Sequence, residues 1–177
     1  MVFNMNYYEI FECDTRNSIG FSVSLFVSGC NMQPKCEGCF SSHTWDFNIG
    51  KPFTQETEDY IIKCLSKPYI TWFSILGGNP TDNLEGGELL KLIKRIRKEL
   101  PHIFIACWSG DIYENLIKND LQKEFIQELD MLRDGRFIPK LSAPKQLFQG
   151  SSNQRIINIK ETINQNKIIE FDWKGGN

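Results

Sequence analysis

The sequence has no apolar run near the roughly twenty residues that a membrane-spanning helix needs. It also lacks an excess of one charge, since 20 Lys and Arg stand against 22 Asp and Glu, a net charge of −2. A basic face for nucleic acid is therefore not expected. The opening stretch MVFNMNYYEIFECD has neither the basic start nor the apolar segment of a signal peptide. We expect a cytoplasmic protein that binds neither membrane nor nucleic acid.

Composition excludes extensive disorder. The chain is 41% hydrophobic and 24% charged, and it contains 13 Phe, which is typical of a folded globular protein. A length of 177 residues is enough for one hydrophobic core. We expect one domain over residues 1–160 and a polar C-terminal tail over residues 161–177, whose last stretch, WKGGN, should be frayed.

Apolar strand-like segments alternate with segments that carry apolar residues at helical spacing. The expected strands cover residues 20–29, 68–76, 102–110 and 130–138, with a short final strand within 148–159. The expected helices cover residues 52–67, 86–101 and 112–129. The first of them is expected to start at Thr54, and the third is expected to be interrupted near Asn119. Leu89, Leu92 and Ile93 should share the buried face of the second helix.

This alternation predicts an α/β fold with a mostly parallel sheet and flanking helices. A complete eight-unit barrel takes about 250 residues, so a truncated, partial TIM-like barrel is expected. In parallel sheets, ligands collect at the C-terminal ends of the strands. Three informative stretches follow expected strands: a cysteine-rich loop, GGNP (77–80) and WSG (108–110). We expect these stretches to converge in space.

The stretch GCNMQPKCEGCF holds Cys30, Cys36 and Cys39, and no fourth cysteine follows at tight spacing. Clustered cysteines in a reducing compartment indicate metal binding or catalysis rather than disulfides. Three thiolates would leave one iron of a 4Fe–4S cluster open, because full ligation takes four. A zinc site with His43 as its fourth ligand and a redox dithiol are the alternatives. The remaining cysteines, Cys13, Cys64 and Cys107, are scattered and expected to act as small hydrophobes.

Eight motifs resemble, in the same order, those of the radical S-adenosylmethionine (SAM) enzymes, and most closely the activating enzymes of anaerobic, class III ribonucleotide reductases. The motifs are LFVSGC, CEGCF, SHTW, GKPFT, LGGNP, CWSG, RDGRF and GSSNQR. The resemblance runs from about Tyr8 to Ile157, so residues 1–160 would form the radical SAM domain. One departure stands out: five residues separate Cys30 from Cys36, where the family has three.

The resemblance implies a 4Fe–4S cluster on Cys30, Cys36 and Cys39, with the fourth iron open for SAM. Reductive cleavage of SAM would give methionine and a 5′-deoxyadenosyl radical. That radical would take a hydrogen atom from a glycine of the reductase large subunit and leave a glycyl radical there. The resemblance also implies an electron donor such as flavodoxin. It implies no catalytic residue, because the cluster and SAM carry out the reaction. The rival functions are a radical SAM enzyme of the deazapurine-synthesis type and a non-catalytic zinc-binding module.

The resemblance also implies a set of SAM contacts at the strand ends. The glycines of GGNP would let the backbone approach the SAM amino group, although GGNP alone is an ordinary turn. Asn79 stands where the family usually has an acid. Phe40 would stack on adenine or belong to the core. Asp134 and Arg136 would meet polar groups of SAM or form a surface ion pair. The implied set is Phe40, Gly77, Gly78, Asn79, Ser109, Asp134 and Arg136.

Overall fold

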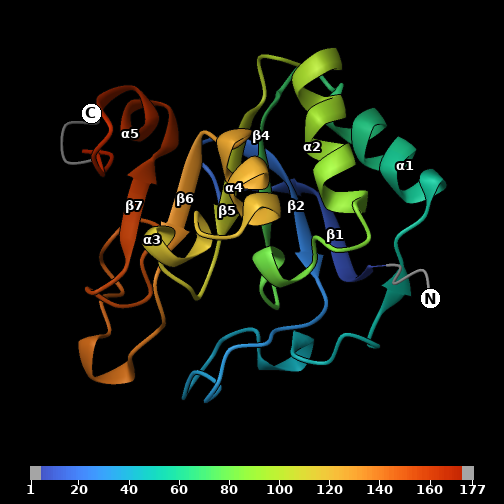
Figure 1. The fold of residues 1–177 in the computed structure, drawn as a ribbon. Coiled ribbons are helices and arrows are strands. Elements are labelled where there is room, and N and C mark those ends of the chain that lie inside the picture. Colours follow the sequence, from blue (N-terminus) through green and yellow to red (C-terminus); the bar gives the residue numbers. More distant parts are fainter. Residues whose placement is uncertain (1–4, 173–177) are drawn as a thin grey trace.

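A computed structural model describes residues 5–172, which form one sheet flanked by helices (Figure 1). The sheet has seven strands in the order β3-β1-β2-β4-β5-β6-β7. The strands are β1 (Asn6–Asp14), β2 (Phe21–Val27), β3 (Lys51–Pro52), β4 (Ile70–Gly77), β5 (Phe104–Trp108), β6 (Met131–Asp134) and β7 (Arg155–Asn158). The helices are α1 (Gln55–Leu65), α2 (Glu88–Glu99), α3 (Tyr113–Leu116), α4 (Asp120–Gln127) and α5 (Ile159–Gln165).

The centre of the sheet is parallel and its edges are antiparallel. β2, β4, β5 and β6 run parallel to one another, while β1 and β3 on one side and β7 on the other run antiparallel. The expected α/β class is confirmed. The sheet does not close on itself, so the narrower expectation of a partial barrel stays a prediction.

β1 is a strand that the sequence pattern did not indicate. Its register against β2 shifts between Tyr7 and Glu9 and again between Phe11 and Asp14. Each shift interrupts the two-residue alternation of buried and exposed side chains. The polar and aromatic residues of β1 therefore lose the periodicity by which a strand is recognised.

Two of the expected helices are confirmed in detail. The Thr54 hydroxyl caps α1 by accepting a hydrogen bond from Thr57 N (3.4 Å), which places the helix start one residue later, at Gln55. The long segment expected at 112–129 divides into α3 and α4. Asn119 caps α4, because its side-chain oxygen accepts from Gln122 N (3.0 Å).

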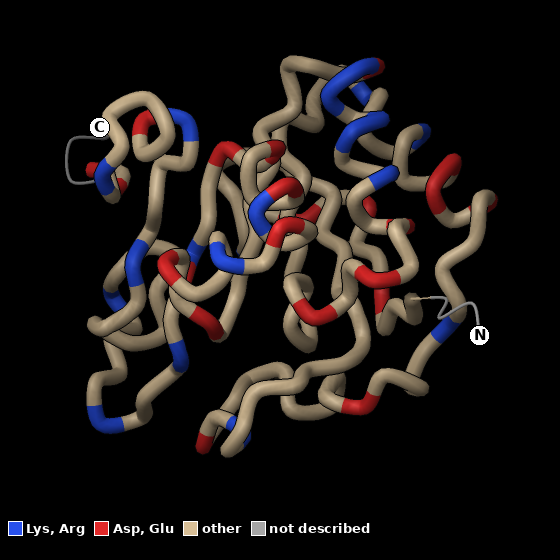
Figure 2. Tube along the Cα trace, in the orientation of Figure 1, with Lys and Arg blue, Asp and Glu red and all other residues tan. Residues whose placement is uncertain are grey.

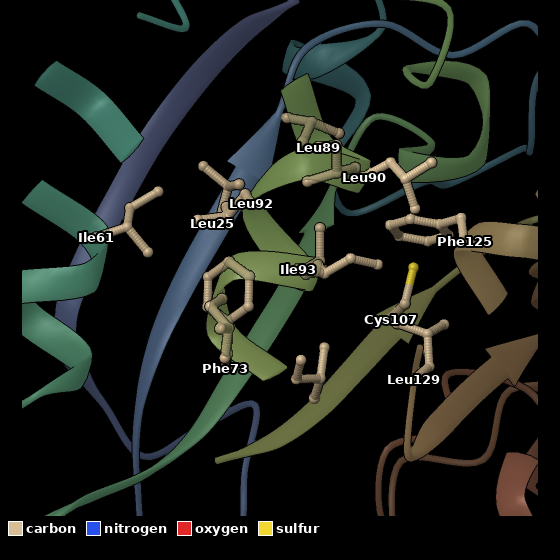
Figure 3. Packing of buried hydrophobic residues seen from close by; sticks show 14 of the residues in the cluster. Leu25, Ile61, Phe73, Leu89, Leu90, Leu92, Ile93, Cys107, Phe125 and Leu129 are labelled. Carbon is tan, nitrogen blue, oxygen red and sulfur yellow. The ribbon is translucent and has the colours of Figure 1, made fainter. Parts of the chain in front are cut away.

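The main core lies between the sheet and the helices α1, α2 and α4 (Figure 3). α2 directs Leu89, Leu92 and Ile93 toward the sheet, and all three are fully buried as expected. Figure 3 shows them near Phe73 of β4 and Cys107 of β5. Burying a side chain of this size contributes about 1.5–3 kcal/mol. This helix layer holds the parallel strands in place, and thereby fixes where their C-terminal ends lie.

The opposite face of the sheet has a smaller cluster built on Trp72, Met131 and Ile156. Phe148, from the segment before β7, packs its ring 5.9 Å from Trp72 and 6.0 Å from Trp108. These contacts bring the segment between β6 and β7 across this face of the sheet, from Trp72 near the start of β4 to Trp108 at the end of β5.

The segment after β7 folds back on the sheet. α5 starts at Ile159, so the expected domain boundary after residue 160 falls inside a helix. Beyond α5, Asn158 N donates to Ile169 O and Phe171 N donates to Ile156 O, both at 2.8 Å. The WKGGN stretch that was expected to be frayed lies outside the described residues.

Charged residues of both signs are spread over many elements (Figure 2). None of the helices formed by residues 5–172 combines the length and the apolar character needed to span a membrane.

Candidate functional site

A cavity of ≈ 590 Å³ lies at the C-terminal ends of the parallel strands. Its wall includes Gly78 after β4, Trp108 at the end of β5 and Arg133 in β6. In Figure 1 the loop that follows β2 crosses this edge of the sheet. The cysteine loop and the ends of the other strands therefore meet at one site, as the alternation of strands and helices predicted.

Cys30, Cys36 and Cys39 all line this cavity, and none of them is in a disulfide. Cys30 is only 8% exposed, and this burial raises the pKa of its thiol. The other two thiols are partly exposed. Within residues 5–172, no three His, Cys, Asp or Glu side chains are gathered closely enough to hold a metal ion. The three thiols thus share one cavity without a preassembled ligand cage.

The donor set fits a group that binds soft sulfur ligands. Cys13, Cys64 and Cys107 do not line the cavity, so three cysteine thiols face it. His43 also lines it, and its ring packs edge-on against Tyr8 at 4.8 Å.

The start of the cysteine loop is held by backbone hydrogen bonds to its own return segment. Gly29 N donates to Thr44 O (2.8 Å), and Cys30 N donates to Trp45 O (3.1 Å). The motifs LFVSGC and SHTW therefore form one paired unit. Further along, Gly38 has a φ of +68° between Cys36 and Cys39, a conformation that glycine adopts without strain.

The segment between Cys30 and Cys36 is held by hydrogen bonds to residues that follow β4 and β6. Asn31 N donates to the Asp82 carboxylate (2.7 Å). The Arg136 guanidinium donates to the carbonyl oxygens of Gln33 (3.1 Å) and Pro34. Arg136 does not line the cavity. In this structure it holds the outer part of the cysteine loop.

The glycines of GGNP let two strand ends approach each other. Gly77 has a φ of +106°, and a Cβ on Gly78 would lie 2.1 Å from Gly29 O. Gly78 N donates to Val27 O (2.9 Å), and Asn79 N donates to Gly29 O (2.7 Å). Both glycines and Asn79 line the cavity. The close neighbour that requires Gly78 is therefore the backbone before Cys30.

Asn79 ties the end of β4 to the end of β5. Its side-chain oxygen accepts from Ser109 Oγ (3.1 Å) and Gly110 N (3.3 Å), while its amide donates to Asp82 (2.8 Å). Ser109 is fully buried and does not line the cavity. Its hydroxyl lies behind Asn79 and also contacts Thr81 Oγ1 (3.0 Å).

Phe40 and Phe137 lie side by side at the cavity, and Asp134 lies behind its wall. Phe40 is 85% exposed, and its ring lies 5.7 Å from that of Phe137; both line the cavity. Asp134 is 1% exposed and is not part of the lining. Its carboxylate accepts from Arg155 Nε (3.0 Å) and Tyr113 N (2.8 Å).

The resemblance placed the stretch RDGR at the SAM pocket, but sequence reasoning gave no role to Arg133, its first residue. It lines the cavity with its side chain half-buried. Burial lowers the pKa of Arg133 to about 10, which leaves it positively charged at neutral pH. Its position at the end of a short predicted strand was the signal that could have drawn attention to it.

Comparison with known proteins first defines the class. Residues 17–157 match the family model described as a 4Fe-4S single cluster domain. This chain is therefore an iron–sulfur domain protein, and the match spans the cysteine loop and every strand end at the cavity.

Relatives then define the family, and the two that follow both carry the name anaerobic ribonucleoside-triphosphate reductase-activating protein. The relative from Escherichia coli (strain K12) is 36% identical over 158 residues, which cover 88% of this chain and 100% of the relative. The relative from Enterobacteria phage T4 is 35% identical over 152 residues, 86% of this chain and 93% of the relative. The chain belongs to the family of anaerobic ribonucleoside-triphosphate reductase-activating proteins.

Proposed function

We propose that this chain is a radical SAM activating enzyme, an oxidoreductase that generates a glycyl radical on the large subunit of an anaerobic ribonucleotide reductase. The observation that carries the proposal is the placement of three free cysteine thiols on one cavity at the strand ends, in a chain of this family. When bound, the cluster and SAM supply the reductive cleavage that yields methionine and a 5′-deoxyadenosyl radical.

Cys30, Cys36 and Cys39 would bind three irons as thiolates, and the fourth iron would remain for SAM. The loop would draw the thiols together on binding, because they form no cage beforehand. Loops that reorganise in this way need fixed ends. The pairing of Gly29 and Cys30 with the return segment at Thr44 and Trp45 provides one.

A cavity of ≈ 590 Å³ is within the range of small-molecule and cofactor sites, about 300–1,000 Å³. In this proposal Phe40, Gly77, Gly78 and Asn79 contact SAM, since all four line the cavity. Ser109, Asp134 and Arg136 support that wall from behind through the hydrogen bonds described above.

The fold would act as a partial barrel whose open side receives the reductase. A primary radical needs a site from which water and competing donors are excluded. The open sheet supplies one wall, and a glycine-bearing loop of the large subunit would supply the cover. Electrons would come from a donor such as flavodoxin in the cytoplasm.

The first experiment tests the metal. Protein purified without oxygen should contain iron and acid-labile sulfide, and single alanine substitutions at Cys30, Cys36 or Cys39 should remove both. Cys13→Ala is the matched control, because Cys13 is exposed and away from the cavity. Stoichiometric zinc in place of iron would instead support the zinc-binding module.

The second experiment tests the partner. Anaerobic mixing with SAM, a reductant and the reductase from the same genome should produce the doublet of a glycyl radical in electron paramagnetic resonance spectra. SAM cleavage without that doublet would refute the activase and favour a small-molecule substrate of the deazapurine type.

A further inference from the structure

Arg133 presents an uncompensated positive charge at the cavity. It lies in β6 and lines the cavity beside the cysteine loop. Within residues 5–172 no ion pair involves Arg133, and its Nε is buried without a hydrogen-bond partner. Buried donors are nearly always satisfied, so an unpaired one calls for an acceptor.

The adjacent acid does not neutralise this charge. Asp134 follows Arg133 in β6, so the two side chains leave opposite faces of the strand. The Asp134 carboxylate is already taken by Arg155 and by Tyr113 N. The hydrogen bond that Arg133 does make, from Nη1 to Gln154 Oε1 (3.1 Å), goes to a neutral amide.

Gln154 holds the guanidinium in a fixed direction. It is 1% exposed, and its Oε1 also accepts from Gly150 N (2.9 Å) and Ser151 N (3.1 Å). Its Nε2 donates to Gly135 O (2.8 Å). With all of these bonds made, the amide cannot turn without losing several of them. The GSSNQR motif thus orients Arg133.

The charge is close enough to act on the cysteine site. Arg133, Cys36 and Cys39 line the same cavity. The cavity also contains Arg16, but that side chain is 73% exposed and lies 3.4 Å from Asp14, with which it pairs. Arg133 therefore differs from Arg16 in being half-buried and unpaired.

We propose that Arg133 is a positioning residue that stabilises negative charge on the sulfur-ligated group at Cys36 and Cys39. This inference rests on the proposed function, because it requires the iron–sulfur cluster. One-electron reduction by an external donor adds one negative charge to the cluster. A fixed cation nearby favours that reduced form and raises the reduction potential. A unit charge about 10 Å away, in an effective dielectric of about 20, changes the equilibrium roughly tenfold.

The test compares Arg133→Gln with Arg133→Lys in reconstituted protein. Iron and sulfide content is measured first, and then the midpoint potential by spectroelectrochemistry without SAM. We expect R133Q to have a ratio of reduced to oxidised cluster roughly tenfold lower at a fixed potential, equivalent to about 59 mV. R133K should restore most of the difference. Arg16→Gln is the matched control, and its potential should stay near that of the unmodified chain.

An R133Q potential equal to that of the unmodified chain would overturn the proposal, as would equal lowering in R133Q and R133K. Unchanged potential with weaker SAM binding would also overturn it and assign the charge to the SAM carboxylate. Loss of the cluster in R133Q but not in R133K would support it, since the charge distinguishes the two variants. If the unmodified chain assembles no cluster, it is the proposed function that fails.

Discussion

Asn79 is the residue whose removal should most clearly separate the ends of β4 and β5. It is 2% exposed. Its side chain donates to Asp82 and accepts from Thr81 Oγ1, Ser109 Oγ and Gly110 N. Asn79→Ala removes all of these bonds, including the one that Gly110 N donates.

The expected loss follows from what each partner can still do. Ser109 Oγ keeps Thr81 Oγ1 at 3.0 Å, and the Asp82 carboxylate keeps Asn31 N at 2.7 Å. Gly110 N loses its described hydrogen bond, because the acceptor of that bond is the Asn79 side chain. Each lost hydrogen bond costs about 0.5–1.5 kcal/mol. We expect Asn79→Ala to lower the free energy of unfolding by about 2–3 kcal/mol.

Urea denaturation of the reduced, metal-free chain, followed by circular dichroism, measures this loss. The matched control is Asn48→Ala, because Asn48 is exposed and donates to Asp46 (3.2 Å) on the surface. The control should stay within about 0.5 kcal/mol of the unmodified chain. A similar small change for Asn79→Ala would refute the reasoning, since it would mean that the two strand ends do not depend on this side chain.

Three further predictions concern the wall and its support. Gly78→Val should lower iron content in folded protein, because a Cβ there lies 2.1 Å from the carbonyl oxygen before Cys30; normal iron would contradict this. Arg136→Gln should speed hydrogen exchange in the cysteine loop, measured by mass spectrometry, since it frees two carbonyls; unchanged exchange would count against the anchor. Arg155 lowers the pKa of Glu114 to about 2, so this stabilisation is present above about pH 4.5 and lost as pH falls through 2. Glu114→Gln should cost less than about 1 kcal/mol at pH 7, because the carboxylate is 47% exposed, and urea titrations should show no difference below pH 2.

Much of the fold could be predicted from patterns among residues that are close together in the sequence. Thr54 and the apolar spacing of α2 act within one or two turns, so the sequence pattern shows them directly. β1 was not predicted, because its two register shifts depend on how β2 pairs with it. The convergence of the cysteine loop with the turns after β4 and β5 followed from a general property of parallel sheets rather than from any single residue.

The roles of individual site residues were harder to predict, because they depend on contacts between distant parts of the chain. Gly78 was interpreted as making room for a ligand, whereas the neighbour that demands glycine is Gly29. Arg136 was expected to meet polar groups of SAM or to form a surface ion pair, and the structure shows it donating to two carbonyl oxygens of the cysteine loop. Both contacts join segments far apart in sequence, and residue type alone did not reveal which partner each side chain would meet.

The wall that holds the cysteines is completed from the far end of the chain. Gln154 fixes Arg133, and Phe148 packs over Trp108. During synthesis the cysteine loop emerges first, and at about 5–20 residues per second the stretch that carries β6 and β7 follows only after roughly 6–25 seconds. Throughout that interval Cys36 and Cys39 are nascent thiols without their cavity, open to oxidation and to whatever metal is at hand. The cavity that the three thiols share is therefore complete only after β7 has been synthesised.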